Sequence, residues 1–400
     1  MTERVNTRGW PRLADTPVLA LGFRPFYLVA AIFATVALPL WIGTYTGALF
    51  FGGAFSGLTW HTHEMIFGFA PAVMAGFLLT AVRNWTGRPT PTGIMLASLV
   101  ALWISGRVLM FVGPMPAAAF VDLMFLPAIG IAIAMPIWQS RNTRNFKVLA
   151  IIAALTLINA LFHLANLNVL PAAMLTAAPV LALDIIALLL AIMGGRVIPA
   201  FTNNAIQAAN ARSNLRIEVV AIGSLILIVL LRLSSLWWQI PMSAWAVVLG
   251  TAAIAHALRL ALWMPHRTVR RPLLLMLPVA YAWLPISLAL GVLVQIGEMP
   301  RAIPIHALTI GAMSGLMLAT MTRSALGHTG RPLSAGWAEI TAFVLLQLAA
   351  IVRVCGALMA PELYRDTVIV AGILWTLAFG VFLVAYWPIL TRPRVDGRPG

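Results

Sequence analysis

The sequence has 400 residues, of which 61% are hydrophobic and 9% charged, with a mean hydropathy of +0.95 and a formal net charge of +15. A soluble domain carries about 25% charged residues, so this composition excludes a soluble protein and indicates a membrane protein with several spans. The single cysteine, Cys355, excludes an internal disulfide and multi-cysteine metal motifs, which leaves histidine, carboxylate, methionine or a cofactor to hold any metal.

Residues 1–24 are basic and interrupted, which is typical of a cytoplasmic tail rather than a cleavable signal peptide,. A membrane span needs about 20 apolar residues. Runs of that length predict twelve transmembrane helices in one all-α domain, a bundle over 25–390 that is followed by a cytoplasmic tail over 391–400. We expect the helices at 26–46, 63–83, 94–112, 117–138, 148–168, 172–193, 217–238, 242–263, 273–296, 304–322, 337–359 and 367–389.

The positive charges predict the orientation of these helices. Lys and Arg are enriched in cytoplasmic loops, and nearly all loop cations share one side if the amino terminus is cytoplasmic. Only Arg301 and Arg365 then fall in loops of the other side. The pattern places both termini in the cytoplasm. It also explains the basic net charge through membrane topology, so we expect no nucleic-acid partner.

Two segments, 60–89 and 303–332, align without a gap and place His63 on His306, Gly68 on Gly311 and TGRP on TGRP. The same number of residues separates each of these histidines from its TGRP motif, and a helix of that length spans about 35 Å. Both histidines are therefore expected at one depth near the outer side. The predicted topology makes helices 2 and 10 parallel, as an internal repeat requires.

Ionisable residues inside the membrane are candidates for function because burying them in hydrocarbon costs several kcal/mol unless they are partnered. Those expected near the outer side are His61, His63, Glu64, Arg107, Asp122, His163, Arg232, His306 and Arg353, and those further inward are Asp184, His256 and Arg259.

Paired histidines on parallel helices can supply both axial ligands of a haem. We therefore expect His63 and His306 to bind haem, with Arg107, Arg232 and Arg353 as cations for the two propionates. The competing interpretation is that each histidine hydrogen-bonds a backbone carbonyl. His61 lies about 200° around a helix from His63, so it is left as an alternative haem ligand, a ligand of a second metal or an interfacial residue.

The other polar residues give weaker indications. Glu64 can orient an imidazole or cap its helix, and capping is favoured. His163 and His256 are candidate copper ligands by residue type alone, whereas His266 and His328 are expected to be exposed in basic loops. Asp184 is expected to pair with Arg196 or Arg259.

Several motifs together resemble the NnrS family of membrane proteins, which contain haem and copper and are associated with denitrification and nitric oxide stress. They are GFRPF at 22–26, WHTHE at 60–64, NWTGRP at 84–89, GGRVIPAFTNNA at 194–205, HALTIGAMS at 306–314 and LGHTGRPL at 326–333. The resemblance implies a multi-pass protein of the bacterial inner membrane with haem b and copper. It places the family's marked histidines on His61, His63, His306 and His328, and its other marked residues on Arg24, Asn84, Arg88, Arg196, Asn204 and Arg331. The family often has arginine where Asn203 stands.

The candidate metal ligands are thus His61, His63, His163, His256, His306 and His328. The leading hypothesis is a haem protein that binds or reduces nitric oxide, or another small gas, or transfers electrons from a donor. Whether it is a haem-dependent nitric oxide oxidoreductase stays open. One alternative is a transporter of metal ions or small anions that uses the same groups, and another is a non-enzymatic nitric oxide sensor or assembly factor.

Overall fold

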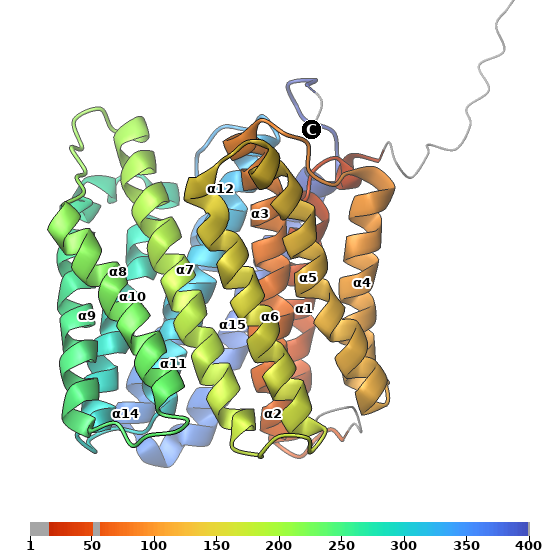
Figure 1. The fold of residues 1–400 in the computed structure, drawn as a ribbon. Coiled ribbons are helices and arrows are strands. Elements are labelled where there is room, and N and C mark those ends of the chain that lie inside the picture. The colour runs from red at the N-terminus through yellow and green to blue at the C-terminus, as the bar shows by residue number, and fades with distance from the viewer. Residues whose placement is uncertain (1–15, 51–56, 399–400) are drawn as a thin grey trace, which may run out of the picture.

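The computed structural model describes residues 16–50 and 57–398, and in these ranges the chain is helical without strands. Residues 1–15 of the predicted amino-terminal tail and residues 399–400 of the carboxy-terminal tail lie outside the described ranges. The helices run side by side in one bundle (Figure 1). The all-α fold class expected from the sequence is therefore confirmed.

Twelve helices of the described ranges are long and apolar enough to cross a membrane. Each overlaps one predicted span. They comprise α1 (Phe23–Tyr45), α2 (Gly57–His63) continuing into α3 (Ala70–Thr86), α4 (Gly93–Val112), α5 (Met115–Gln139), α6 (Phe146–Asn166), α7 (Met174–Ala205), α8 (Leu215–Ser234), α9 (Met242–Leu262), α10 (Pro272–Gln295), α11 (Ala302–His306) continuing into α12 (Gly315–His328), α13 (Trp337–Ile351) continuing into α14 (Ala357–Met359), and α15 (Tyr364–Thr391).

The span that carries the WHTHE motif is the most enclosed one. In the apolar window of Gly57–Thr86, 89% of residues are buried, compared with 22% in α8. Helices α1 and α15, from opposite ends of the chain, pack against each other beside this span, and α13 packs on α15 (Figure 1). Helices α8, α9 and α10 pack in sequence on the other side of the bundle. Trp60, His63 and Glu64 of the WHTHE motif are buried, so this motif lies inside protein rather than against lipid.

Helix α7 is longer than the sequence predicts, because it continues past 193 and through Pro199 to Ala205. Gly194 and Gly195 directly follow the expected span, and in the structure they allow close packing of neighbouring side chains. A Cβ at Gly194 would lie 2.9 Å from the Tyr281 ring, and one at Gly195 would collide with the Arg259 guanidinium. Neighbouring helices thus stabilise a segment whose residues alone favour a break.

The two aligned segments share an unusual backbone order. In both, a short α-helix ends at the histidine and a π-helical stretch follows at once, Glu64–Phe69 in one and Ala307–Ser314 in the other. At the far ends, the TGRP glycines Gly87 and Gly330 have φ of 65° and 76°, which glycine adopts without strain and which terminates helices. A third π-helical stretch, Val352–Gly356, contains Arg353. Such segments are rare and occur frequently at functional sites.

Candidate functional site

A large cavity lies between α1, α2, α7, α10 and α11 and contains two of the predicted ligands. Its volume is about 1160 Å³, and His61, His306 and Arg353 line it together with mostly apolar side chains. We call it the histidine cavity. Pockets for small ligands usually measure about 300–1,000 Å³, so this one is large enough for a bulky cofactor.

His306 is held in a defined orientation by its own helix. Its Nδ1 lies 2.6 Å from the carbonyl oxygen of Ala302, one turn earlier. Because a carbonyl only accepts, Nδ1 must donate, and the neutral ring then carries no proton on Nε2. A backbone carbonyl that fixes the tautomer in this way is what metal-binding histidines commonly have. The hydrogen bond named above as the competing interpretation is therefore present, and it leaves Nε2 able to bind a metal.

His61 is fixed by stacking rather than by a hydrogen bond. Its ring lies 4.1 Å from the Trp41 ring at an interplanar angle of 23°. Its Nδ1 has no hydrogen-bond partner among the described residues. His61 is close enough to interact electrostatically with His306 and Arg353. The structure thus brings His61, and not His63, into the cavity with His306.

The three arginines expected near the propionates have different surroundings. Arg353 is 4% exposed; its Nη2 donates to the Tyr364 hydroxyl at 2.6 Å, and its Nη1 has no partner among the described residues. Arg232 also lines the cavity but is bound to Asp184 at 2.8 Å. The expected pairing of Asp184 with Arg196 or Arg259 is wrong, because Arg232 reaches it from the adjoining helix α8. Arg107 lies elsewhere.

His63 belongs to a separate buried cluster with Asp122 and His163, which we call the His–Asp–His cluster. His163 Nε2 lies 2.8 Å and His63 Nε2 3.3 Å from Asp122 Oδ2. One ligand atom from each residue lies within 4.8 Å of the others, and all three residues are buried. Helices α2, α5 and α6 contribute one residue each. Two imidazoles and one carboxylate form a donor set that suits transition metals.

Further polar side chains orient this cluster. Glu64 Oε1 lies 2.9 Å from His63 Nδ1 and accepts from Arg107 Nη1 at 2.7 Å, while Arg107 Nη2 donates to Asp122. Asn159 bonds both His63 and Asp122, at 3.1 and 2.7 Å. Glu64 therefore orients an imidazole, and the favoured assignment of helix capping is wrong because Glu64 follows the short helix α2 and is fully buried.

The glycine at position 68 makes this arrangement possible. A Cβ there would lie 2.6 Å from Arg107 Nη1 and 3.2 Å from Glu64 Oε2. Trp103 donates to the Gly68 carbonyl at 3.0 Å and so holds α4 against the same π-helical stretch. Gly68 thus admits the guanidinium between the helices.

The charges of the cluster leave room for a cation. Glu64 and Asp122 are two carboxylates, and among the described residues Arg107 is the one arginine bound to them. His63 has an oxygen acceptor at each ring nitrogen, Glu64 at Nδ1 and Asp122 and Asn159 at Nε2. A proton on His63 balances the second carboxylate in this arrangement, and a cation bound at Nε2 would take the place of that proton.

The remaining predicted histidines lie apart from both sites. His256 is buried and bonds the Tyr281 hydroxyl through Nδ1 at 2.7 Å. His328 ends α12 with its ring 5.6 Å from the Phe23 ring; it is half-buried, so the expectation of an exposed loop position is wrong for it, whereas His266 is exposed. Neither His256 nor His328 belongs to a group of three metal-binding side chains in the described part of the chain.

Sequence reasoning missed Asn159 and Trp41. Asn159 could have been identified from the sequence, because it is an amide in the middle of the largely apolar helix α6. Trp41 could not, because a tryptophan near a helix end is also typical of a membrane interface.

A search of the curated proteins finds no match to this chain. The family model described as NnrS protein matches residues 17–394, which includes the histidine cavity, the His–Asp–His cluster and every transmembrane helix. By this match, the chain belongs to the NnrS protein family.

Proposed function

We propose that this chain is a haem-binding protein of the bacterial inner membrane that acts in the response to nitric oxide, with haem b held in the histidine cavity by His61 and His306. The observation that carries the proposal is that these two imidazoles share one large cavity, with His306 in the tautomer that leaves Nε2 available. This pair replaces the pair His63 and His306 expected from the repeat.

The surroundings of the two histidines fit this cofactor. Trp41, Trp375 and Met313 are among the apolar side chains that line the cavity, and haem requires an apolar slot with cations for its propionates. Arg353 provides such a cation, since one guanidinium nitrogen has no partner within the described residues and the side chain is buried. A charge-assisted hydrogen bond from this nitrogen would satisfy it.

The two ligands are held unequally, which bears on what the protein does. The Ala302 carbonyl locks His306, whereas His61 is positioned by its contact with Trp41 and has no hydrogen bond at Nδ1 among the described residues. We assign His61 as the exchangeable ligand for this reason. Bound haem supplies an iron that takes up nitric oxide or passes electrons. A small apolar gas can reach the cavity through lipid.

Spectroscopy of the purified protein tests this proposal. We expect a Soret band that is lost in His306→Ala and weakened or shifted in His61→Ala, while His256→Gln, a buried histidine away from the cavity, leaves it unchanged. After nitric oxide is added to the reduced protein, the paramagnetic spectrum should show that His306 is still bound to the iron and that His61 has been displaced from it.

Two results would count against it, and a third would distinguish among the roles of a haem protein. Colourless but stable wild-type protein would favour a transporter, and loss of haem in His63→Gln but not in His61→Ala would show that the wrong pair is assigned. Haem without consumption of nitric oxide in the presence of reductant would favour a sensor or assembly factor.

We also propose copper for the His–Asp–His cluster. Its support is the donor set of His63, Asp122 and His163, together with the carboxylate of Glu64 on the far nitrogen of His63. A carboxylate that accepts a hydrogen bond from the other ring nitrogen of a ligating imidazole raises the basicity of that imidazole. Bound copper would supply a redox-active centre, and the protein's part is to hold three donors in a buried site.

Metal analysis separates this second site from the first. His163→Gln should lower the copper content of protein loaded with copper and leave the Soret band in place. An unchanged copper content in His163→Gln and in Asp122→Asn would refute the assignment.

A further inference from the structure

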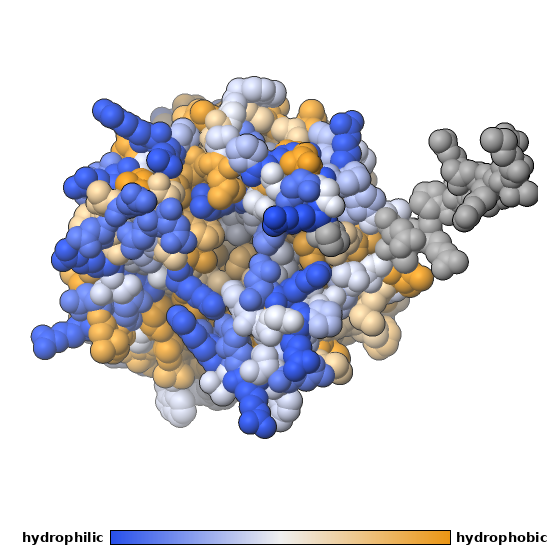
Figure 2. Space-filling view, turned by 90° about the horizontal axis from the view of Figure 1, so that it is seen from above, coloured by the Kyte–Doolittle hydropathy of each residue, from blue (hydrophilic) through white to orange (hydrophobic). Residues whose placement is uncertain are grey.

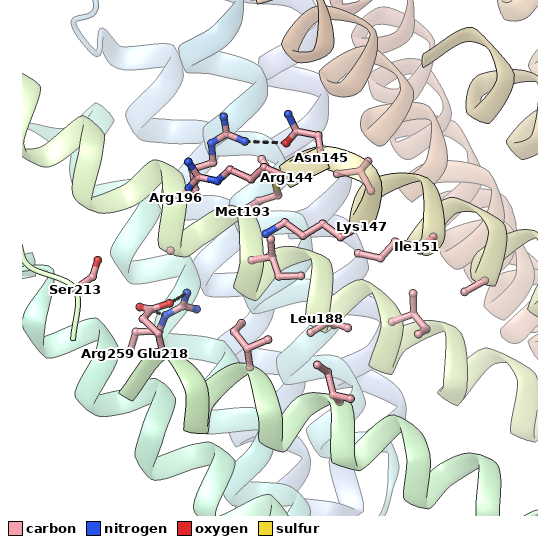
Figure 3. Close-up of a pocket in the computed structure, with 18 residues that line it drawn as sticks. Arg144, Asn145, Lys147, Ile151, Leu188, Met193, Arg196, Ser213, Glu218 and Arg259 are labelled. Atoms are coloured by element: carbon pink, nitrogen blue, oxygen red, sulfur yellow. Dashed lines mark hydrogen bonds and ion pairs between the residues drawn. The ribbon is translucent and has the colours of Figure 1, made fainter. Parts of the chain in front are cut away.

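A second pocket lies at the opposite end of the bundle from the histidine cavity, the end that the charge pattern assigns to the cytoplasm. It has a volume of about 610 Å³ and lies between α6, α7 and α8, with the turn Thr143–Asn145 at its mouth. Arg144, Lys147 and Arg196 line it (Figure 3). We call it the basic pocket. Figure 2 shows hydrophilic side chains gathered over this end of the molecule, with hydrophobic ones among them.

The three cations of the basic pocket face one another without an acidic partner. Arg144 interacts electrostatically with Lys147 and with Arg196, and these contacts are repulsive. Within the described residues, none of the three forms an ion pair with a carboxylate. Glu218 also lines the pocket, but Arg259 binds both of its oxygens, at 2.7 and 2.5 Å. The basic pocket therefore presents unneutralised positive charge.

The neighbouring polar groups strengthen the site. Arg196 is oriented by Asn145, whose Oδ1 accepts from Nη1 at 3.1 Å, and its guanidinium lies 4.6 Å from the centre of the Trp85 ring. Asn145 is 1% exposed, and its Nδ2 has no hydrogen-bond partner in the described part of the chain. This leaves an amide donor beside the oriented guanidinium of Arg196, which is the donor chemistry that phosphate oxygens accept.

Below the cations the basic pocket becomes apolar. Ile151, Leu188, Ile192, Ile222 and Ile226 line it toward the middle of the bundle, and Leu188, Ile192 and Ile222 are partly exposed while Ile226 is exposed. The groove is thus open on the face that would meet lipid. A phospholipid has a charged headgroup followed by apolar acyl chains. The basic pocket matches this sequence, because a cluster of cations is followed by an apolar groove along the helices.

We infer that the basic pocket binds an anionic phospholipid of the cytoplasmic leaflet, with phosphate on Arg144, Lys147 and Arg196 and an acyl chain along the groove. Basic pockets between transmembrane helices on this side of a membrane bind such headgroups. Three cations match two phosphates better than one, so cardiolipin should bind more tightly than phosphatidylglycerol. The site does not depend on haem or copper.

Native mass spectrometry of the full chain in detergent, titrated with defined lipids, tests this inference. Arg144→Gln with Lys147→Gln should weaken cardiolipin binding by about 30-fold, from about 1 kcal/mol for each cation. Both residues are exposed, so the fold should tolerate the change. The matched control is Arg83→Gln with Arg270→Gln, which removes two exposed cations from the same end but outside the pocket, and it should leave binding unchanged.

A second variant distinguishes a lipid from free phosphate. Ile222→Trp fills the groove and keeps every cation, so it should weaken cardiolipin binding without affecting the binding of inorganic phosphate. The inference would be overturned if the control variant, Arg83→Gln with Arg270→Gln, lost as much cardiolipin affinity as Arg144→Gln with Lys147→Gln. It would also be overturned if phosphatidylcholine bound as tightly as cardiolipin. Inorganic phosphate that displaces cardiolipin, together with unchanged lipid binding in Ile222→Trp, would also overturn it and identify a phosphate site.

Discussion

Arg107 should be among the most sensitive positions of the molecule. It is 7% exposed and, in the part of the chain that the structure describes, is the one arginine that binds the two buried carboxylates of Glu64 and Asp122. Replacing it with methionine keeps much of the side-chain volume but leaves both carboxylates without their cation. Breaking a buried ion pair from one side costs about 3–5 kcal/mol, so we expect Arg107→Met to lose at least that much stability.

The matched control is Arg232→Met. Arg232 pairs with a single carboxylate, Asp184, and both side chains line the histidine cavity, with 28% and 15% of their surfaces exposed. Its replacement strands one carboxylate instead of two, so we expect a smaller loss of stability there than at Arg107. The free energy of unfolding, measured in mixed micelles with a rising fraction of denaturing detergent, compares the two variants directly.

A rescue experiment tests the cause. Adding Glu64→Gln and Asp122→Asn to Arg107→Met removes the stranded charges, so the triple variant should be more stable than Arg107→Met alone. If Arg107→Met costs no more than Arg232→Met, or if the triple variant is the least stable of the three, the reasoning about this network is refuted.

Two further predictions concern packing and another buried carboxylate. Gly195→Ala should lower the free energy of unfolding by about 1–3 kcal/mol, because its methyl group would displace the Arg259 guanidinium. Gly223→Ala is the control, because a methyl group there meets nothing within 4 Å, and equal melting temperatures of the two variants would contradict this prediction. Tyr386→Phe removes a 2.7 Å hydrogen bond to the buried Glu339, which should lower the free energy of unfolding by about 1–3 kcal/mol and so lower the melting temperature. An unchanged melting temperature would show that water replaces the hydroxyl.

The number and position of the helices could be predicted from the sequence because hydrocarbon imposes one requirement on every span, a sufficient length of apolar residues. The exception was α7, which was expected over 172–193 and continues through Gly194 and Gly195 to Ala205. Their role depends on Tyr281 and Arg259, which are distant in sequence, so no local signal could have revealed it.

The choice between His61 and His63 could not be made from spacing. The residues lie on one short helix, and their separation predicted correctly that they face different directions. Which direction leads to His306 depends on how α2 is rotated in the bundle, and the π-helical stretch after His63 changes that rotation. The grouping of Asp122 with His163 likewise required the packing of α5 on α6.

The π-helical stretches after His63 and His306 have a consequence for how these helices can vary. A π turn closes hydrogen bonds over five residues instead of four, so each stretch shifts the angular phase between the histidine end and the TGRP end of its helix. Deleting one residue from 307–314 would be absorbed by the return of this stretch to an ordinary α-helix, so His306 would nearly keep its direction relative to α12,. The same deletion within the regular α-helix Gly315–His328 would instead turn His306 by about 100° relative to the TGRP end. The π-helical stretches are therefore the places where these two helices can change length by one residue and still present the histidine in the same direction.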